Sequence, residues 1–344
     1  MANQRYDNFV LENRLKDQLA TKLEMLNYVT VDDTLTESAG MIKKINVYKA
    51  NGEAQDVAEG EGNTESIEMS YTPKEYKVGT TQARFVYSDE DSMSDPYMID
   101  AGVQKLSEGL INALYKKVNA EYWNATKYVP VASGETIGFD HFADAIALFN
   151  RERDEEVERF ALCNPNMAAK LRKSLKDLLK YNEDFVHTGY IGSVAGVPVI
   201  GDKLVPDGAV ILATKAAVTY FRKKSVETEQ DRDMNTRKNI LYGRQVGVVA
   251  FTDADECVII APVGTAPTIS TATISAGEDV AIAGTCVSGA RVAIFVNGTQ
   301  AGNAIVNGTA WSYTLDKVSA GDSVKAVAYV VGNAAAESAA KTVA

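Results

Sequence analysis

The feature that most constrains this chain is a long helical repeat that directly follows a long hairpin pattern. Asp95 suits a helix N-cap and Pro96 suits the first helical position. A helix over 95–125 would have roughly 30 residues and a length of about 45 Å, whereas an average helix has about 11–12 residues. This outline is not that of a compact enzyme. The apolar residues of the repeat fall at spacings of three or four: Ile99, Val103, Leu106, Leu110, Leu114, Val118, Tyr122 and Ala125.

The hairpin is predicted over residues 42–86. Apolar residues alternate with polar ones in its two arms, as in half-buried strands. Residues 52–64 between the arms are acidic and contain glycine, which predicts a polar, flexible tip. An isolated two-stranded hairpin is marginal in water, so the rest of the chain or another subunit must support it.

The charge of the chain excludes tight binding of nucleic acid through a basic surface. The 344 residues include 35 Lys and Arg against 46 Asp and Glu, a net charge of −11, and contain no long basic run. The first residues have no apolar signal core, and no apolar stretch approaches the roughly 20 residues of a membrane span. We therefore expect synthesis in a cytoplasm and no membrane partner.

Composition predicts a boundary near residues 262–267. Residues 264–344 carry four basic and five acidic residues, so nearly all of the net charge lies before them. Residues 135–262 read as mixed α/β, with a short strand over 160–163, a helix that Asn164 caps, and another helix from Thr214 to about Lys224. Residues 267–344 predict a small β-sandwich with Trp311 in its core and hairpin turns at Asn297-Gly298 and Asn307-Gly308.

Residues with catalytic or metal-binding chemistry are sparse. His141 and His187 have no cysteine or acidic residue at metal-ligand spacing, so a surface or packing role is favoured for both. Cys163, Cys257 and Cys286 are widely spaced and odd in number, which favours small buried apolar residues over disulfides or a zinc site. No nucleotide-binding or hydrolase motif is present. We therefore predict no catalytic residue, no cofactor and no metal.

Two acidic groups leave alternatives open. Glu59 and Glu61 at the hairpin tip, or Asp89, Glu90 and Asp91 before the long helix, could act as an acid/base pair or a cation site. The simpler interpretation is a solvated tip and an acidic turn next to a helix N-terminus, and we favour it.

This order of elements resembles the major capsid proteins of tailed bacteriophages, which share the Hong Kong 97 capsid fold. Two segments carry the resemblance. Residues 160–171 are similar to the family's strand, Asn-Pro and helix segment. Residues 189–200 with 204–208 are similar to its Gly-x-Ile-Gly-x-x-x-Gly-x-Pro-Val segment with its x-x-Pro-x-Gly continuation.

The resemblance implies an α+β fold and a shell function. It divides a capsid domain, residues 1–262, into an N-arm over 1–35, an E-loop over 42–86, a spine helix over 95–125 and an axial domain over 130–260. Copies would self-assemble into pentamers and hexamers of an icosahedral head, with a portal and a separate scaffolding protein, around double-stranded DNA that they do not bind tightly. It implies a virion protein assembled in the host bacterial cytoplasm, and we expect assembly contacts at the E-loop tip, from Glu53, Asp56, Glu59 and Glu61.

The C-terminal residues 267–344 resemble a bacterial immunoglobulin-like domain. Residues 292–298, 310–315 and 330–333 carry its strand and turn pattern. The resemblance implies an outward position on a phage surface, with a glycan as a possible ligand. Two other functions stay open: the shell of an encapsulin-like bacterial nanocompartment that encloses a cargo enzyme, and a surface adhesin, which the missing signal core disfavours for the whole chain.

Overall fold

A computed structural model describes residues 24–36, 40–51, 66, 68–95, 97–150, 158–179, 193–277 and 279–344. The backbone contacts divide the chain into two compact units that are interleaved in sequence. Unit 1 comprises Met1–Val118 and Val218–Thr252, and unit 2 comprises Asn119–Ala217 and Asp253–Ala344. The predicted boundary near residues 262–267 lies within unit 2, and the division into a capsid domain and a C-terminal domain stays a prediction.

Unit 1 is built on a four-stranded sheet in the order β1-β10-β11-β4. Its two long strands form an antiparallel ribbon whose register runs from Val218↔Phe251 to Asp233↔Lys238. β4 extends the ribbon antiparallel along β11, and β1 extends it parallel along β10. The strands are β1 (Thr30–Asp32), β4 (Gly79–Ser88), β10 (Val218–Asp233) and β11 (Lys238–Phe251).

The helix predicted from Thr214 to Lys224 is wrong, because β10 begins at Val218. The run Val218-Thr219-Tyr220-Phe221 is β-branched and aromatic, so it suits a strand better than a helix. It also pairs on both sides, with β1 and with β11. Further along β10, Glu227 and Glu229 lie on one face, where Arg244 contacts both at 3.0 Å.

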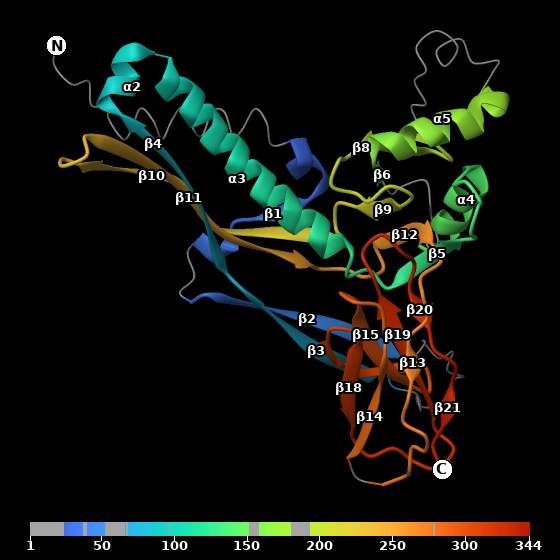
Figure 1. Cartoon of the computed structure of the whole chain (residues 1–344). Helices are drawn as coiled ribbons and strands as arrows, with labels where there is room; N and C mark the ends of the chain where they lie inside the picture. Colours follow the sequence, from blue (N-terminus) through green and yellow to red (C-terminus); the bar gives the residue numbers. More distant parts are fainter. Residues whose placement is uncertain are drawn as a thin grey trace, which may run out of the picture. The chain divides into compact units, whose positions relative to one another are not determined.

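The long helix α3 spans Met98–Tyr122 and lies along this sheet (Figure 1). It starts three residues later than predicted, where the Asp95 carboxylate accepts a hydrogen bond from the Tyr97 N–H at 3.0 Å. All eight residues of the predicted apolar repeat are buried. In unit 1, Val103, Leu106, Leu110 and Ile111 form one core with Val226 and Leu241 of the sheet.

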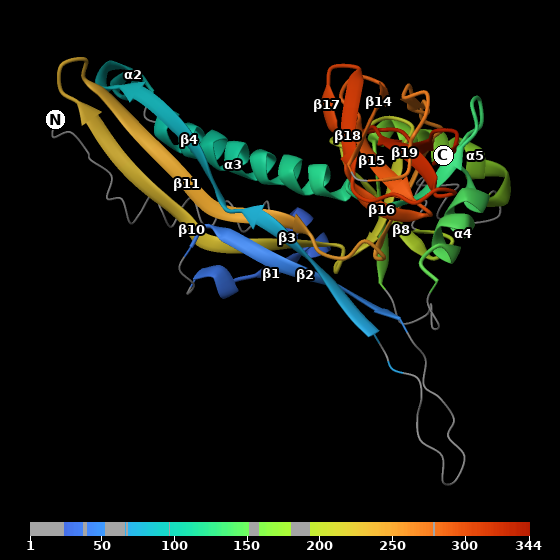
Figure 2. The same cartoon turned by 90° about the horizontal axis from the view of Figure 1, so that it is seen from below.

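The predicted hairpin is confirmed in part. β2 (Ile42–Asn51) pairs with β3 (Glu68–Lys77) over ten residues in a separate two-stranded sheet, which projects away from the larger sheet of unit 1 (Figure 2). The predicted outer bound of residue 86 is wrong, because residues 79–88 pair with β11 instead. The smaller elements of unit 1 are the 3-10 helices η1 (Glu24–Tyr28) and η2 (Thr34–Thr36) and the helix α2 (Asp89–Ser94). The predicted N-arm over 1–35 lies mostly outside the described residues.

Unit 2 contains a six-stranded mixed sheet in the order β5-β12-β9-β6-β8-β7. α4 (Phe139–Ala147) and α5 (Pro165–Leu179) pack on it around Phe142, Met167 and Leu171. The predicted cap of α5 is confirmed, since Asn164 Oδ1 accepts from the Asn166 N–H at 3.0 Å. The strands are β5 (Lys127–Val131), β6 (Arg159–Cys163), β7 (Ser193–Val194), β8 (Val197–Gly201), β9 (Val210–Thr214) and β12 (Cys257–Pro262).

The C-terminal part of unit 2 consists of two further sheets around one core. Trp311 is buried in that core, as predicted, and the turns at Asn297-Gly298 and Asn307-Gly308 join paired strands. The immunoglobulin-like relationship stays a prediction. The strands are β13 (Thr268–Ile269), β14 (Val280–Thr285), β15 (Arg291–Val296), β16 (Thr299–Asn303), β17 (Ile305–Asn307), β18 (Ala310–Leu315), β19 (Ser323–Tyr329), β20 (Ala336–Glu337) and β21 (Lys341–Thr342).

Two glycines of α3 test the packing of this helix on the sheet. A Cβ at Gly102 would overlap the Phe85 ring, whereas a Cβ at Gly109 would meet no atom within 4 Å. We expect Gly102→Ala to destabilise the chain by about 1–3 kcal/mol through overpacking. Gly109→Ala is the matched control and should stabilise it by up to about 1 kcal/mol, because alanine is the better helix former. Urea unfolding of both variants measures the difference, and equal effects would contradict this packing.

Candidate assembly surfaces

The predicted contact residues at the hairpin tip, Glu53, Asp56, Glu59 and Glu61, lie outside the described residues. The structure describes the stem of the hairpin, where β2 and β3 pair from Ile42↔Lys77 to Asn51↔Glu68. The role of the four carboxylates in assembly therefore stays a prediction.

One face of the stem is held at its base by the sheet of unit 1. Lys43 and Tyr76 are cross-strand partners on this face. The Lys43 ammonium lies 4.4 Å from the centre of the Phe221 ring, and the Tyr76 hydroxyl donates to the Phe251 carbonyl at 3.1 Å. Partly buried Ile45 packs on the same cluster, beside buried Val78. This face is therefore fixed within the chain.

The opposite face of the stem presents apolar side chains to solvent. Successive strand residues alternate between faces, so Met69, Tyr71 and Ile42 share the face opposite Lys43 and Tyr76. Their exposed fractions are 67%, 65% and 56%. Lys44 and Glu75 form a 2.7 Å ion pair on this same face, and Lys77 is exposed there. We call this face, with its apolar and charged residues, the stem face. Met69 and Tyr71 are neighbours on this face, whereas Ile42 lies at the base of the stem, beyond the Lys44–Glu75 ion pair.

A second group of exposed apolar side chains lies at the end of unit 1 where β10 turns into β11. Met93 in α2 and Tyr97 between α2 and α3 are 74% and 78% exposed, and Met234 in the turn is 81% exposed. Figure 1 shows α2 and the β10–β11 turn at the same end of the sheet. We call Met93, Tyr97 and Met234 the tip platform.

Hydrogen bonds and ion pairs tie α2 to the ribbon beneath the tip platform. The Asp89 carboxylate accepts from Arg232 and from the Asn239 amide, both at 2.8 Å. Glu90 pairs with Arg237 at 3.4 Å. Asp91 and Ser88 form a capping box, and these hydrogen bonds lower the pKa of the Asp91 carboxyl. Asp89, Glu90 and Asp91 thus have structural roles in the first turn of α2, whereas Glu59 and Glu61 lie outside the described residues.

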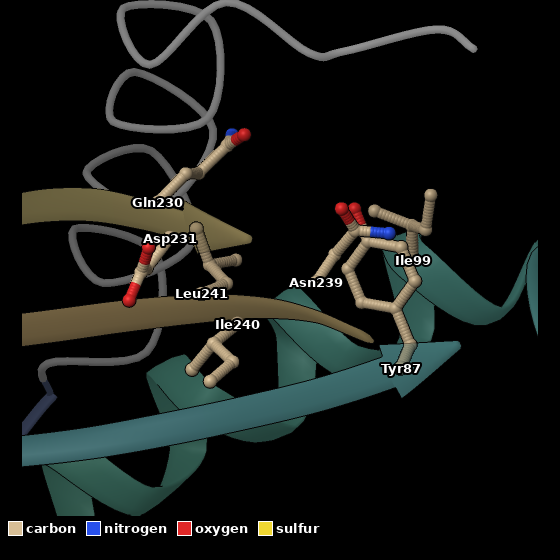
Figure 3. A pocket seen from close by; sticks show the side chains of 7 residues that line it. All are labelled: Tyr87, Ile99, Gln230, Asp231, Asn239, Ile240 and Leu241. Carbon is tan, nitrogen blue, oxygen red and sulfur yellow. The ribbon is translucent and has the colours of Figure 1, made fainter. Parts of the chain in front are cut away.

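A small cavity lies near this end, between β4, α3, β10 and β11 (Figure 3). Its volume of about 10 Å³ has room for about one water molecule and for no organic ligand. The lining residues are Tyr87, Ile99, Gln230, Asp231, Asn239, Ile240 and Leu241.

The residues with reactive or ligating side chains do not converge in the part of the chain that the structure describes. Cys163 and Cys257 are buried free thiols, as predicted, and burial raises the pKa of Cys163 to about 11 and raises that of Cys257 further. Cys286 is only partly buried, which the sequence did not predict. His141 Nδ1 accepts from the Gly138 N–H at 3.4 Å, and His187 lies outside the described residues.

Two further absences hold for the described residues. No group of three or more His, Cys, Asp and Glu side chains is placed to hold a metal ion. No helix is both long enough and apolar enough to cross a membrane.

The C-terminal sheets expose aliphatic rather than aromatic side chains. Val263, Val287, Ile305 and Val331 are their exposed large apolar residues. Trp311 is buried, and Tyr313 and Tyr329 lie partly or fully inside. Over residues 263–277 and 279–344, two aromatic side chains are buried and two, Phe295 and Tyr313, are partly buried.

Sequence reasoning missed both apolar surfaces. It predicted contacts at the acidic hairpin tip instead, because an excess of charged residues can be recognised from composition alone. The sequence did contain a signal for the stem face. In β3, the odd-numbered Met69 and Tyr71 lie on one face and the even-numbered Tyr76 lies on the other, so both faces of the hairpin carry apolar or aromatic side chains. No local signal identifies the tip platform, because Met93 and Met234 are distant in sequence.

Solved structures share this fold at low sequence identity. The mature capsid of bacteriophage PhiM1 matches 76% of this chain and 88% of its own, with a TM-score of 0.55 and 12% identity. The structure from Mycobacterium phage Che8 matches 76% of this chain and 94% of its own, with a TM-score of 0.50 and 15% identity. A virus-like particle from Pyrococcus furiosus matches 73% of this chain and 98% of its own, with a TM-score of 0.51 and 13% identity. The predicted Hong Kong 97-type capsid fold is confirmed.

Sequence comparisons point the same way. The major capsid protein of Staphylococcus phage phiMR11 is 27% identical over 257 residues, which are 73% of this chain and 91% of that protein. The family model described as phage capsid protein matches residues 71–260, which include most of β3, the whole of α3 and the ribbon of unit 1. That match covers more than half of the chain, and it places the chain in the phage capsid protein family, a family of structural proteins.

Proposed function

We propose that this chain is the major capsid protein of a tailed phage and that its copies build the icosahedral head around double-stranded DNA. Membership of the capsid family supports self-assembly into a shell, and makes the chain a component of the virion. The observation that carries the proposal within this chain is the β2–β3 hairpin. Its base is fixed by the sheet of unit 1, while its stem face exposes apolar residues.

A two-stranded sheet of this kind is marginal by itself in water. One face of the stem is stabilised at its base by Phe221 and Phe251, and the other exposes Met69 and Tyr71. A neighbouring copy supplies the missing support when the hairpin lies across it. Contacts between two different surfaces of identical copies close into rings, which are the pentamers and hexamers of the proposed shell.

The acidic charge sets the relation to DNA. With a net charge of −11, the subunit as a whole disfavours tight binding to phosphate. Encapsidation is then driven by a packaging motor through a portal, with a separate scaffolding protein directing assembly in the host cytoplasm. The C-terminal sheets are proposed as an immunoglobulin-like decoration on the outside. No described residue favours a glycan ligand for them.

The encapsulin-like nanocompartment is distinguished by what the particle contains. Purified shells from infected cells should contain double-stranded DNA of one length. Shells that contain a cargo enzyme and no DNA would show that the chain forms a nanocompartment and would contradict the phage-head function.

Deleting residues 50–62 tests the role of the hairpin. We expect a folded subunit that forms no shells, because the base contacts of Lys43 and Tyr76 remain while the end of the stem and the tip are lost. Electron microscopy of the variant co-expressed with its scaffold measures assembly, and thermal unfolding checks the fold. Intact shells from the folded variant would contradict the role of the hairpin.

The purified subunit should bind DNA weakly at physiological salt, because it offers little basic surface for the release of counterions. A titration of labelled double-stranded DNA at several salt concentrations measures the affinity. Sub-micromolar binding that weakens steeply with salt would contradict the proposed enclosure without tight binding.

A further inference from the structure

The C-terminal sheets have two outer faces, and only one of them is open to solvent. We call the sheets β13-β14-β18-β17 and β16-β15-β19-β20, which share one core, the C-terminal sandwich. In a sandwich, residues that point away from the core alternate with core residues and are normally exposed. The first sheet follows this rule, since its outward residues are exposed and uncharged. They include Ala281, Ala283, Thr285, Ser312 and Thr314.

The outward row of the second sheet is instead buried. Ala293 and Val327 are cross-strand partners with exposed fractions of 1% and 6%, and Tyr329 of the same row is 9% exposed. The neighbours of these residues along β15 and β19 belong to the sandwich core, so the row itself points the opposite way. A row that points away from the core is buried only when something outside the sandwich covers it.

The cover comes from β5, the edge strand of the six-stranded sheet of the same unit. The Tyr128 ring of β5 lies 6.1 Å from the Tyr329 ring, measured between ring centres, and Tyr128 packs on the cluster that contains Ala293 and Val327. The Arg291 guanidinium lies 4.5 Å from the centre of the same Tyr329 ring. Both kinds of ring contact are favourable, so this edge of the sheet is bound to the sandwich.

Backbone hydrogen bonds hold the connection between the two sheets from both sides. The Val263 N–H donates to the Val131 carbonyl of β5 at 3.1 Å, and the Ala334 N–H of the sandwich donates to the Pro262 carbonyl at 2.8 Å. A Cβ at Gly264 would overlap the Ala334 carbonyl oxygen, so this close approach requires glycine. The segment that follows β12 is therefore bonded to both sheets.

A further contact lies in the loop that joins β19 to β20. Gly332 has a φ of +89° and packs on Pro206, where an added Cβ would lie 3.2 Å from the Pro206 Cβ. Ala334 in the same loop is 1% exposed. The end of β19 and this loop thus meet β5, the end of β12 and the loop before β9, which all belong to the six-stranded sheet or its connections.

We propose that the C-terminal sandwich is a rigid extension of the six-stranded sheet, docked through the outer face of β15 and β19. Domains on a linker move relative to one another by default, unless a well-packed apolar interface joins them. The partner of this outer face is the same chain, so the face is closed to ligands. An external partner would instead meet the exposed face of the sheet β13-β14-β18-β17. Because that face is held in one orientation, binding to it costs little ordering of the sandwich.

Amide hydrogen exchange of the unmodified subunit tests the docking. The N–H groups of Val263 and Ala334 should be protected, because each donates to a carbonyl of another element, although the Val263 side chain is 61% exposed. On a flexible linker, both amides would exchange as fast as in an unfolded chain. Exchange at that rate, read by mass spectrometry with fragmentation to single residues, would overturn the proposal.

Two substitutions test the contact at separate points. Tyr128→Ala removes the covering ring, and Gly264→Ala pushes the connection away from the Ala334 carbonyl. Each should raise hydrogen exchange over residues 329–336 by about tenfold or more, because local opening of the contact becomes easier. Residues 209–214 and 310–315, in the centres of the six-stranded sheet and the sandwich, should keep their exchange rates.

The matched control is Ile305→Ala, which shortens an apolar side chain that is 76% exposed on the other sheet of the sandwich. It should leave exchange over residues 329–336 unchanged. The docking is overturned if Tyr128→Ala and Gly264→Ala are both folded and do the same. It is also overturned if exchange rises as much over 310–315 as over 329–336, because the sandwich would then unfold rather than detach. Neither outcome affects the shell function, which is read from assembled particles.

Discussion

The antiparallel pairing of β10 with β11 is the interaction on which unit 1 depends. Thirteen residue pairs join the two strands between Val218↔Phe251 and Asp233↔Lys238. α3 packs on one face of this ribbon, β4 extends its edge, the hairpin base attaches near Phe251, and α2 is tied to the far turn through Arg232. A two-stranded ribbon is marginally stable in water unless another element packs on it. The buried row of α3 and the ribbon therefore stabilise one another.

The same ribbon separates the two candidate assembly surfaces. It places the stem face at one end of unit 1 and the tip platform at the other. A capsid subunit needs this property. Apolar surface that a chain cannot bury alone is left for its neighbours, and distance along a rigid element prevents the chain from burying it internally.

Sequence reasoning succeeded where the signal was local and periodic. The buried row of α3 from Ile99 to Tyr122, the cap of α5 by Asn164 and the turns at Asn297-Gly298 and Asn307-Gly308 were predicted because spacing and turn chemistry act within a few residues. It failed at residues 218–224, where pairing with distant β1 and β11 decides the strand. The end of the hairpin was misplaced for the same reason, since β4 pairs with β11.

By itself, the sequence determined the periodic elements, the acidic charge that disfavours tight DNA binding, and a resemblance specific enough to predict the capsid fold. Only the tertiary structure decided which residues of the hairpin face solvent, and which residues meet at the β10–β11 turn. A period of two defines two faces of a strand but not which of them is buried, because Phe221 and Phe251 lie more than 140 residues from Lys43 and Tyr76. The approach of α2 to the β10–β11 turn likewise depends on the pairing of β4 with β11 and on the contacts of Asp89 and Glu90 with the ribbon.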